Sequence, residues 1–218
     1  MLIIGAKGFA KEVLEVFQQL GKTVHLAFYD DVNENVDAFL FDIFPILKNE
    51  SQVAAFFNAN GNEFTIGIGN PLLRYALSKK FEALGGNYCT TISPLALMSS
   101  FDVHIGKGTN ILMNAVFSNS VTLGKGCLVY YNAIITHDCE IGDFVEISPN
   151  VTLLGRCKIG SFTQIGASAT ILPDVIVGEN VIIGAGAVVT KHVPANVVVV
   201  GSPARIIRAL EPINLTVS

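Results

Sequence analysis

The side chains with the clearest potential for chemistry are His137 and the adjacent Asp138. Imidazole has an ordinary pKa of about 6.5, so it can accept a proton from a substrate at neutral pH. A neighbouring carboxylate that orients the ring raises its basicity. The pair therefore predicts a general base with an orienting acid. The alternative is a histidine that lies on the surface and takes part in no reaction.

The chain around this pair repeats every six residues. From Ile105 to Val189, fifteen successive positions spaced by six hold a large apolar residue. A fixed period is typical of solenoid folds. Period six fits short strands joined by corners, because residues two apart on a strand point to the same side, here inward. Three strands close one coil of a triangular prism, so eighteen residues form a coil and five coils are expected, with glycines relaxing the backbone at the corners.

The position of His137 in this repeat predicts where its side chain lies. It follows an inward apolar residue by two positions, so we expect it to project from an edge of the prism. In the coils on either side, eighteen residues away, stand Asn119 and Gly155. Glycine at position 155 removes a side chain next to the imidazole, and we expect this gap to leave room for a substrate.

Residues 1–92 have a different pattern, in which short apolar strands alternate with helices. We expect strands over 2–4, 24–29, 64–68 and 88–92, and helices over 9–19, 50–58 and 71–84. This alternation predicts a small Rossmann-like parallel α/β domain. The expected domains are thus 1–92, a prism with a C-terminal cap over 93–208, and a tail over 209–218.

In parallel α/β sheets, ligands bind at the carboxyl ends of the strands. Three loops fall there: 5–9, 30–31 and 69–70. The first opens a helix whose N-terminus favours an anion, and the carboxylates of Asp30 and Asp31 suit sugar hydroxyl groups. Each loop also has a plainer interpretation, because strand-to-helix turns need glycine for geometry and paired aspartates are common in solvated turns.

Composition excludes several classes of function. The chain has 218 residues, a net charge of −4 and 14 Lys and Arg residues, which argues against nucleic acid or an anionic membrane as partner. No apolar run approaches the roughly 18 residues of a membrane span, and the first residues lack signal-peptide features, so we expect a cytoplasmic protein. Cys127, Cys139 and Cys157 fall on inward small positions, which favours core packing over a disulfide or metal site.

Several segments together resemble one family from end to end. They are residues 5–8, 29–31 and 68–70 with Arg74, then 136–144, 184–189 and 200–204. The family is that of the acetyl-CoA-dependent sugar acetyltransferases of bacterial glycan biosynthesis. These hexapeptide-repeat acyltransferases include sialic acid O-acetyltransferases and N-acetyltransferases of nucleotide-linked 4-amino-4,6-dideoxy sugars. The resemblance implies a left-handed β-helix, although the general rule for parallel crossovers favours the right hand.

The resemblance also implies a homotrimer with active sites between neighbouring prisms, acetyl-CoA as cosubstrate and no metal. It makes His137 the general base and Asp138 the acid that raises its basicity. The implied contacts to the nucleotide-linked sugar are Lys7, Gly8, Phe9, Asp30, Asp31, Gly69, Asn70 and Arg74. The implied contacts to the cofactor are Glu146, Gly155, Ala167, Ala185, Lys191 and Arg205.

The chain departs from the family at two places. Phe9 follows Gly8 where the family often has a histidine, and Glu146 stands where relatives can carry a histidine that touches the acetyl group. The expected function is acetyl transfer from acetyl-CoA to the amino group of a nucleotide-linked 4-amino-4,6-dideoxy sugar. The alternatives are O-acetylation of a sugar of the sialic acid type and a non-catalytic scaffold that binds a nucleotide sugar. A γ-class carbonic anhydrase needs three zinc-binding histidines, and Gly142 stands where the second is expected.

Overall fold

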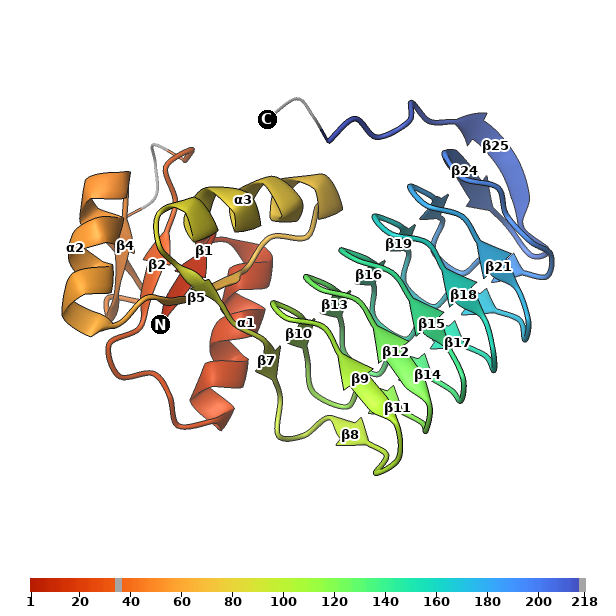
Figure 1. The fold of residues 1–218 in the computed structure, drawn as a ribbon, viewed down its shortest axis with the longest axis horizontal. Coiled ribbons are helices and arrows are strands. Elements are labelled where there is room, and N and C mark those ends of the chain that lie inside the picture. The colour runs from red at the N-terminus through yellow and green to blue at the C-terminus, as the bar shows by residue number, and fades with distance from the viewer. Residues whose placement is uncertain (34–36, 216–218) are drawn as a thin grey trace.

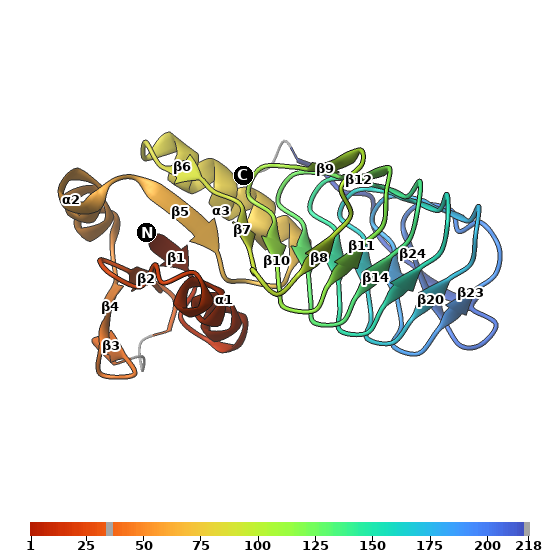
Figure 2. The ribbon, with the colours of Figure 1, turned by 90° about the horizontal axis from the view of Figure 1, so that it is seen from below.

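The computed structural model describes residues 1–33 and 37–215 and has two parts (Figure 1, Figure 2). An N-terminal α/β domain is followed by a prism of stacked coils that leads away from it. The fold predicted from the sequence is confirmed in both parts, and the prism is a left-handed β-helix. Within the described ranges, every helix is too short or too polar to span a bilayer.

The N-terminal domain is a six-stranded sheet flanked by three helices. Its strands are β1 (Leu2–Ile4), β2 (Ala27–Tyr29), β3 (Phe39–Leu40), β4 (Phe44–Leu47), β5 (Glu63–Ile66) and β6 (Asn87–Tyr88), and its helices are α1 (Gly8–Gln19), α2 (Glu50–Asn60) and α3 (Pro71–Ala83). The spatial order is β3-β4-β2-β1-β5-β6, and only β3 runs antiparallel to its neighbour. Side chains alternate along β1, so Ile3 packs on the α1 side, and Leu2 and Ile4 pack on the side of α2 and α3.

Three details of this domain differ from the expectation. The second strand begins at Ala27 rather than at residue 24, because Val24 lies in the preceding turn and is 75% exposed. The hairpin of β3 and β4 was not predicted; in it, β4 extends the parallel sheet next to β2. The strand expected over 88–92 is two strands, since β6 stays in this sheet and β7 (Thr91–Ile92) begins the prism.

The prism has three faces, each a parallel sheet with one strand per coil. The first face contains β7, β10 (Asn110–Ile111), β13 (Leu128–Val129), β16 (Glu146–Ile147), β19 (Gln164–Ile165), β22 (Ile182–Ile183) and β24 (Val197–Val200). The second contains β8 (Leu97–Met98), β11 (Val116–Phe117), β14 (Ile134–Ile135), β17 (Thr152–Leu153), β20 (Thr170–Ile171) and β23 (Val188–Val189). The third contains β9 (Val103–Ile105), β12 (Val121–Leu123), β15 (Glu140–Ile141), β18 (Lys158–Ile159) and β21 (Ile176–Val177).

The repeat positions fill the interior of the prism. From Ile111 to Val189 every large repeat residue is buried, and so are the small residues two positions before them. Paired residues in adjacent coils are eighteen apart, as Ile135 and Leu153 are. Only at the N-terminal end, at Ile105, is a large repeat position partly open. The period of the sequence therefore translates directly into the stacked core.

The corners are left-handed turns, but not at the glycines expected there. The residues with positive φ include Asp138 (61°), Arg156 (64°) and Asp174 (63°). The glycines that follow inward residues have another role. A Cβ at Gly124 would lie 2.5 Å from the carbonyl carbon of Gly142 in the next coil. These glycines let successive coils approach each other, so their interpretation as relaxed bends was wrong.

The last two strands form a cap. β24 continues the first face, and β25 (Arg205–Ala209) pairs with it antiparallel. The chain then turns back along the prism (Figure 1), where Asn180 donates to the carbonyl of Glu211 at 2.9 Å. The tail expected over 209–218 thus starts at the last residue of β25, and its final residues, 216–218, lie outside the described part of the chain.

Candidate active site

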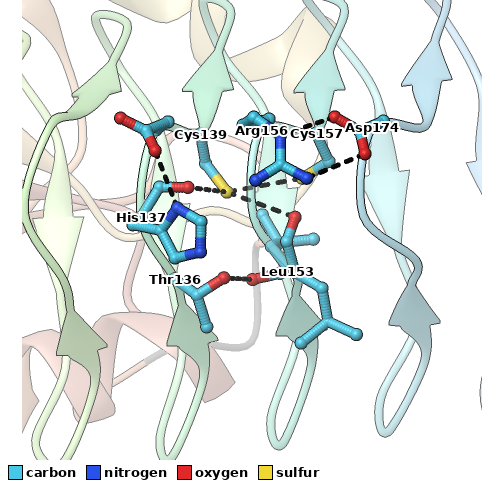
Figure 3. A network of polar contacts seen from close by, with 9 residues as sticks. Thr136, His137, Cys139, Leu153, Arg156, Cys157 and Asp174 are labelled. Atoms are coloured by element: carbon cyan, nitrogen blue, oxygen red, sulfur yellow. Dashed lines mark hydrogen bonds and ion pairs between the residues drawn. The ribbon is translucent and has the colours of Figure 1, made fainter.

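His137 and Asp138 occupy the corner that joins β14 on the second face to β15 on the third. Figure 3 shows the His137 side chain at this corner. The imidazole Nδ1 lies 2.7 Å from Asp138 Oδ2, and both side chains are 53% exposed. A carboxylate only accepts hydrogen bonds, so Nδ1–H donates and the lone pair of Nε2 stays available. The two side chains thus form a pair in which the imidazole is held in one tautomer and is half open to solvent.

Gly155, in the next coil, lies directly beside this imidazole. A Cβ at position 155 would lie 2.5 Å from Cε1 and 2.7 Å from Nε2 of His137. The histidine ring itself fills the space that the glycine leaves, so the expectation of room for a substrate there was wrong. The absence of a side chain at position 155 instead decides where the base can lie.

A charged pair continues the same edge of the prism beyond the base. Arg156 donates from Nε to Asp174 Oδ1 at 2.6 Å and from a terminal nitrogen to Oδ2 at 2.8 Å (Figure 3). The hydrogen bonds from Arg156 lower the pKa of Asp174, and the charges of Arg156 and His137 act in the same direction. This pair was not predicted from the sequence, although Arg156 follows Asp138 by eighteen residues and Asp174 follows Arg156 by the same spacing.

Two thiols lie on the inner side of the same corner. The sulfur atoms of Cys139 and Cys157 are 3.6 Å apart, and both residues are buried in the core (Figure 3). The hydrogen bond to Cys139, together with burial, raises the pKa of Cys157. These two cysteines and Cys127 are free and buried, which agrees with the predicted role in packing.

A cavity in the N-terminal domain forms a second part of the candidate site. It has a volume of about 360 Å³ and opens at the carboxyl ends of β1, β2 and β5. The predicted sugar contacts that line it are Lys7, Gly8, Phe9, Asp30, Asp31 and Gly69. Lys7 is the N-cap of α1, and its side chain makes no cap hydrogen bond with the helix. The free N–H groups of the first turn suit an anion such as a phosphate.

The two aspartates of this cavity have different partners. Asp30 is buried, and its carboxylate accepts a hydrogen bond from the backbone N–H of Asn33 at 3.0 Å, so it shapes the loop. Asp31 accepts from Tyr29 Oη at 2.7 Å and from Lys80 Nζ at 3.3 Å. Burial acts to raise the pKa of Asp31, but the hydrogen bonds from Tyr29 and Lys80 outweigh it and lower the pKa. Asp31 therefore remains an ionised acceptor at neutral pH.

Arg74 does not belong to the wall of the cavity. It is 1% exposed, and its guanidinium donates to the carbonyl groups of Gly126 at 3.0 Å, Phe144 at 2.8 Å and Gly69. A buried cation needs such partners, and these bind α3 and the Gly69 loop to a corner of the prism. Its position is thus the junction between the domains, and the predicted substrate contact stays a prediction. Asn70 lies outside the cavity wall as well and serves as the N-cap of α3.

The N-terminal domain covers part of the first face of the prism. Asn110 is buried there, accepts from Thr65 Oγ1 at 2.9 Å and donates to the carbonyl of Ile66 at 2.8 Å. Phe9 contacts Tyr130, with ring centroids 5.1 Å apart. Neither contact was predicted, because the repeat shows that a residue faces outward but not whether it faces water or another domain.

Glu146 lies on this same first face, next to the cavity loop. A Cβ at Gly69 would lie 3.5 Å from Glu146 Oε1. Burial raises the pKa of Glu146, and the nearby charge of Arg74 acts in the opposite direction. Because His137 lies at the corner opposite the first face, a single chain does not bring these two side chains together.

The other cofactor candidates lie along two edges of the prism. Ala167 and Ala185 follow β19 and β22, at the corner between the first and second faces. Lys191 lies on the edge of His137, three coils further along, and lines a cavity of about 360 Å³ together with Arg205. Among residues 1–33 and 37–215, no three His, Cys, Asp or Glu side chains gather in a way that could hold a metal ion.

Comparisons with known proteins agree with both parts of the fold. Residues 1–81 match the PglD N-terminal domain model, and residues 120–155 and 156–191 match the model of the bacterial transferase hexapeptide (six repeats). The acetyltransferase domain of PglB from Neisseria gonorrhoeae is 30% identical, with a TM-score of 0.86 over 94% of this chain and 98% of that one. The same domain has been solved in complex with acetyl coenzyme A.

Two further solved structures have similar coverage. A histidine-to-asparagine mutant of perosamine N-acetyltransferase from Caulobacter crescentus, in complex with CoA and GDP-perosamine, is 25% identical, with a TM-score of 0.87 over 95% of this chain and 96% of that one. WeeI from Acinetobacter baumannii is 30% identical, with a TM-score of 0.74 over 94% and 98% of the two chains. No curated protein matches the sequence significantly.

Proposed function

The chain belongs to the hexapeptide-repeat acyltransferases, in the family of sialic acid O-acetyltransferases and nucleotide-4-amino-sugar N-acetyltransferases, and on this premise we propose its reaction. It transfers an acetyl group from acetyl-CoA to the amino group of a nucleotide-linked 4-amino-4,6-dideoxy sugar. The observation that carries this function is the base at His137, fixed by a hydrogen bond of 2.7 Å to Asp138. The amine is favoured as acceptor because a similar enzyme was solved with CoA and GDP-perosamine.

The chemistry follows from the geometry of the base. The amine nitrogen attacks the thioester carbonyl, so a C–N bond forms and the C–S bond breaks. Nε2 of His137 takes the proton that the nitrogen loses, and the imidazolium returns it to the departing CoA thiolate. Asp138 stabilises the imidazolium that forms in between. No metal is needed for this step, because a thioester is already activated and the positioning of the two substrates supplies much of the remaining acceleration.

The second face of the prism suits contact between copies of the chain. Its outward side chains are uncharged: Leu97, Val116, Ile134, Thr152, Thr170 and Val188. The third face instead carries charges, including Lys158 and Glu140, which pair at 2.9 Å. Three copies that turn their second faces to a common axis would form a homotrimer. The edge with His137 of one copy would then meet the edge of Ala167 and Ala185 of the next.

This arrangement would also unite the base with the N-terminal cavity. Phe9 lines the cavity and contacts Tyr130, which follows β13 at the corner between the first and second faces. The nucleotide-linked sugar is proposed to bind in the cavity, with a phosphate at the start of α1 and its amine directed toward the base of the neighbouring copy. Asp31 and the Gly69 loop would then hold the sugar and nucleotide.

The cofactor is proposed to lie along the seam between two prisms. Lys191 and Arg205 are cations on one cavity, which suits the phosphates of CoA. Gly155, Ala167 and Ala185 would line the path of the thioester with backbone and small side chains. Glu146 stays a proposed contact where the acetyl group and the acceptor meet. Both substrates are cytoplasmic metabolites, so we propose a cytoplasmic location.

The proposal is tested by thiol release from acetyl-CoA with UDP-, GDP- and dTDP-linked 4-amino-4,6-dideoxy sugars, with free sialic acid as the control for O-acetylation. We expect thiol release with at least one nucleotide-linked amino sugar and an amide in the product by mass spectrometry. Sedimentation should give the mass of three chains. Turnover of sialic acid alone would favour the O-acetyltransferase. Binding of a nucleotide sugar without any thiol release would favour a non-catalytic scaffold.

A further inference from the structure

Asp138 has two possible cationic partners, and only one of them is its neighbour His137. Asp138, Arg156 and Asp174 occupy the same corner of three successive coils, all with a left-handed backbone. Arg156 therefore stands between two aspartates, roughly 4.8 Å from each along the stack. It pairs with Asp174 through hydrogen bonds of 2.6 and 2.8 Å, and Asp138 is left to the imidazole of His137 (Figure 3).

We propose that Asp174 is a positioning residue of the active site. It holds the guanidinium of Arg156 away from Asp138 and so preserves the hydrogen bond that orients His137. The inference rests on the proposed function, because it assigns His137 the role of base. It assigns a role in the active site to a residue that lies two coils away from His137.

A guanidinium paired with Asp138 would weaken the base in two ways. A bidentate pair uses both carboxylate oxygens, so the imidazole would lose the acceptor that fixes its tautomer. The guanidinium would also bring a positive charge toward the imidazole, which disfavours protonation of the ring. The competition already exists in the native arrangement, because Asp138 adds to the raised pKa of Arg156 after the larger effect of Asp174.

The surroundings of the imidazole leave few other groups that could produce this effect. Asp138 is on its own corner, and Arg156 and Asp174 follow in the next two coils. The Cys139 thiol is a further titratable group: it donates to the His137 carbonyl at 3.8 Å and accepts from Cys157 at 3.6 Å, and this second hydrogen bond lowers its pKa. Arg156 and Asp174 are 52% and 64% exposed, so water screens their charges and the expected effect is moderate.

The test is Asp174→Asn, which removes the charge with little change in size. Asparagine tolerates the positive φ of 63° at this position, so the fold should persist. The titration of the His137 imidazole is followed by NMR, with its resonances assigned by comparison with His137→Ala. The midpoint should fall by about half a pH unit to one unit. The acidic limb of the pH profile of kcat/KM should move in the same direction, with a loss of roughly three- to tenfold on the plateau.

Arg156→Ala and the double variant are the matched controls. Arg156→Ala alone should move the midpoint by less than a third of the Asp174→Asn shift, because the guanidinium is already engaged elsewhere. Arg156→Ala/Asp174→Asn should bring the midpoint back close to that of the native protein. A double variant that keeps the full shift would show that Asp174 acts only through its own charge, and this would overturn the positioning role.

Two further outcomes are decisive. An Asp174→Asn variant that melts at a lower temperature with an unchanged imidazole midpoint would reduce Asp174 to a structural residue and overturn the inference. The NMR titration requires no turnover, so it remains valid for a protein that acetylates none of the acceptors. Failure of the proposed function is therefore distinguished from failure of this inference.

Discussion

Polar groups are buried at the junction between the two domains, whereas those at the edge that carries His137 are exposed. At the junction, Arg74 and Asn110 are buried, and carbonyl or side-chain partners match their polar atoms. At the edge, His137 and Arg156 are about half exposed. A buried polar group holds geometry because losing its partner is costly, whereas an exposed group exchanges partners with water at little cost. The molecule thus separates the buried polar groups that fix its shape from exposed groups that can change partners.

Removing the base is the strongest test of this separation. His137→Ala should lower kcat by about 10²- to 10⁴-fold, the usual contribution of a general base. The midpoint of thermal unfolding should change little, because the side chain is 53% exposed. The control is His104→Ala, since His104 forms a similar exposed pair with Asp102 at 2.8 Å but lies on the third face. Equal losses of activity in both variants would contradict the role of His137.

Removing the buried cation should have the reverse effect. Arg74→Met leaves several buried carbonyl groups without a donor, so the free energy of unfolding should fall by about 2–4 kcal/mol. The kcat of the remaining folded protein should stay within a few-fold of the native value. Urea denaturation measures the free energy of unfolding. Initial rates divided by the concentration of sites from active-site titration give kcat. Lys79→Met, an exposed position of the same helix, is the control and should change neither quantity.

A methyl group beside the base should give an intermediate result. Gly155→Ala places a Cβ where the imidazole lies, 2.5 Å from its Cε1, so the ring must move. Displacement of a catalytic group by about 1 Å can cost on the order of 100-fold in rate, and we expect a loss of kcat of about ten- to a hundredfold. Calorimetry should show a small change in stability. Full activity would mean that the position of the ring is less constrained than the packing suggests.

The smallest effect is expected at Glu146, a titratable side chain within the junction. Burial raises its pKa above the ordinary value of 4.5, so the folded state binds this proton more tightly than the unfolded state. Stability should therefore fall as pH rises from about 4.5 through the folded-state pKa, and the penalty persists at neutral pH. Glu146→Gln should stabilise the protein by less than about 1 kcal/mol at pH 7.5 and not at pH 4. An equal change at both pH values in urea denaturation would exclude ionisation as the cause.

The prism was predictable because the position of a residue in the six-residue repeat determines whether its side chain faces inward. A large residue every six positions, with a small one two places earlier, is sufficient to place Ile135 and Cys139 in the core before any coordinates are known. The N-terminal strands and helices were predictable to within a few residues for a different reason, the alternation of short apolar strands with helices of helical apolar spacing. The hairpin of β3 and β4 was not, because Phe39 is 50% exposed and its short strand has no clear alternation.

The candidate site was predictable in part. Adjacent residues such as His137 and Asp138 meet through local geometry, and loops at the ends of parallel strands share one edge of a sheet. Contacts between elements that are distant in sequence produce no comparable pattern in the sequence. The burial of Arg74 depends on carbonyl groups about 50 to 70 residues away, at Gly126 and Phe144. Gly155 was misread because sequence spacing gives the neighbours of a gap but not which of them fills it.

A single chain keeps its base on one side of the prism and its nucleotide cavity on the other. Under the proposed function, a lone subunit would hold the acceptor far from His137, and acetyl-CoA would be consumed only once subunits have assembled. Turnover should depend on dilution, with specific activity falling once subunits separate. In the proposed trimer, the division of the site between neighbouring copies would protect acetyl-CoA from hydrolysis before both substrates are bound.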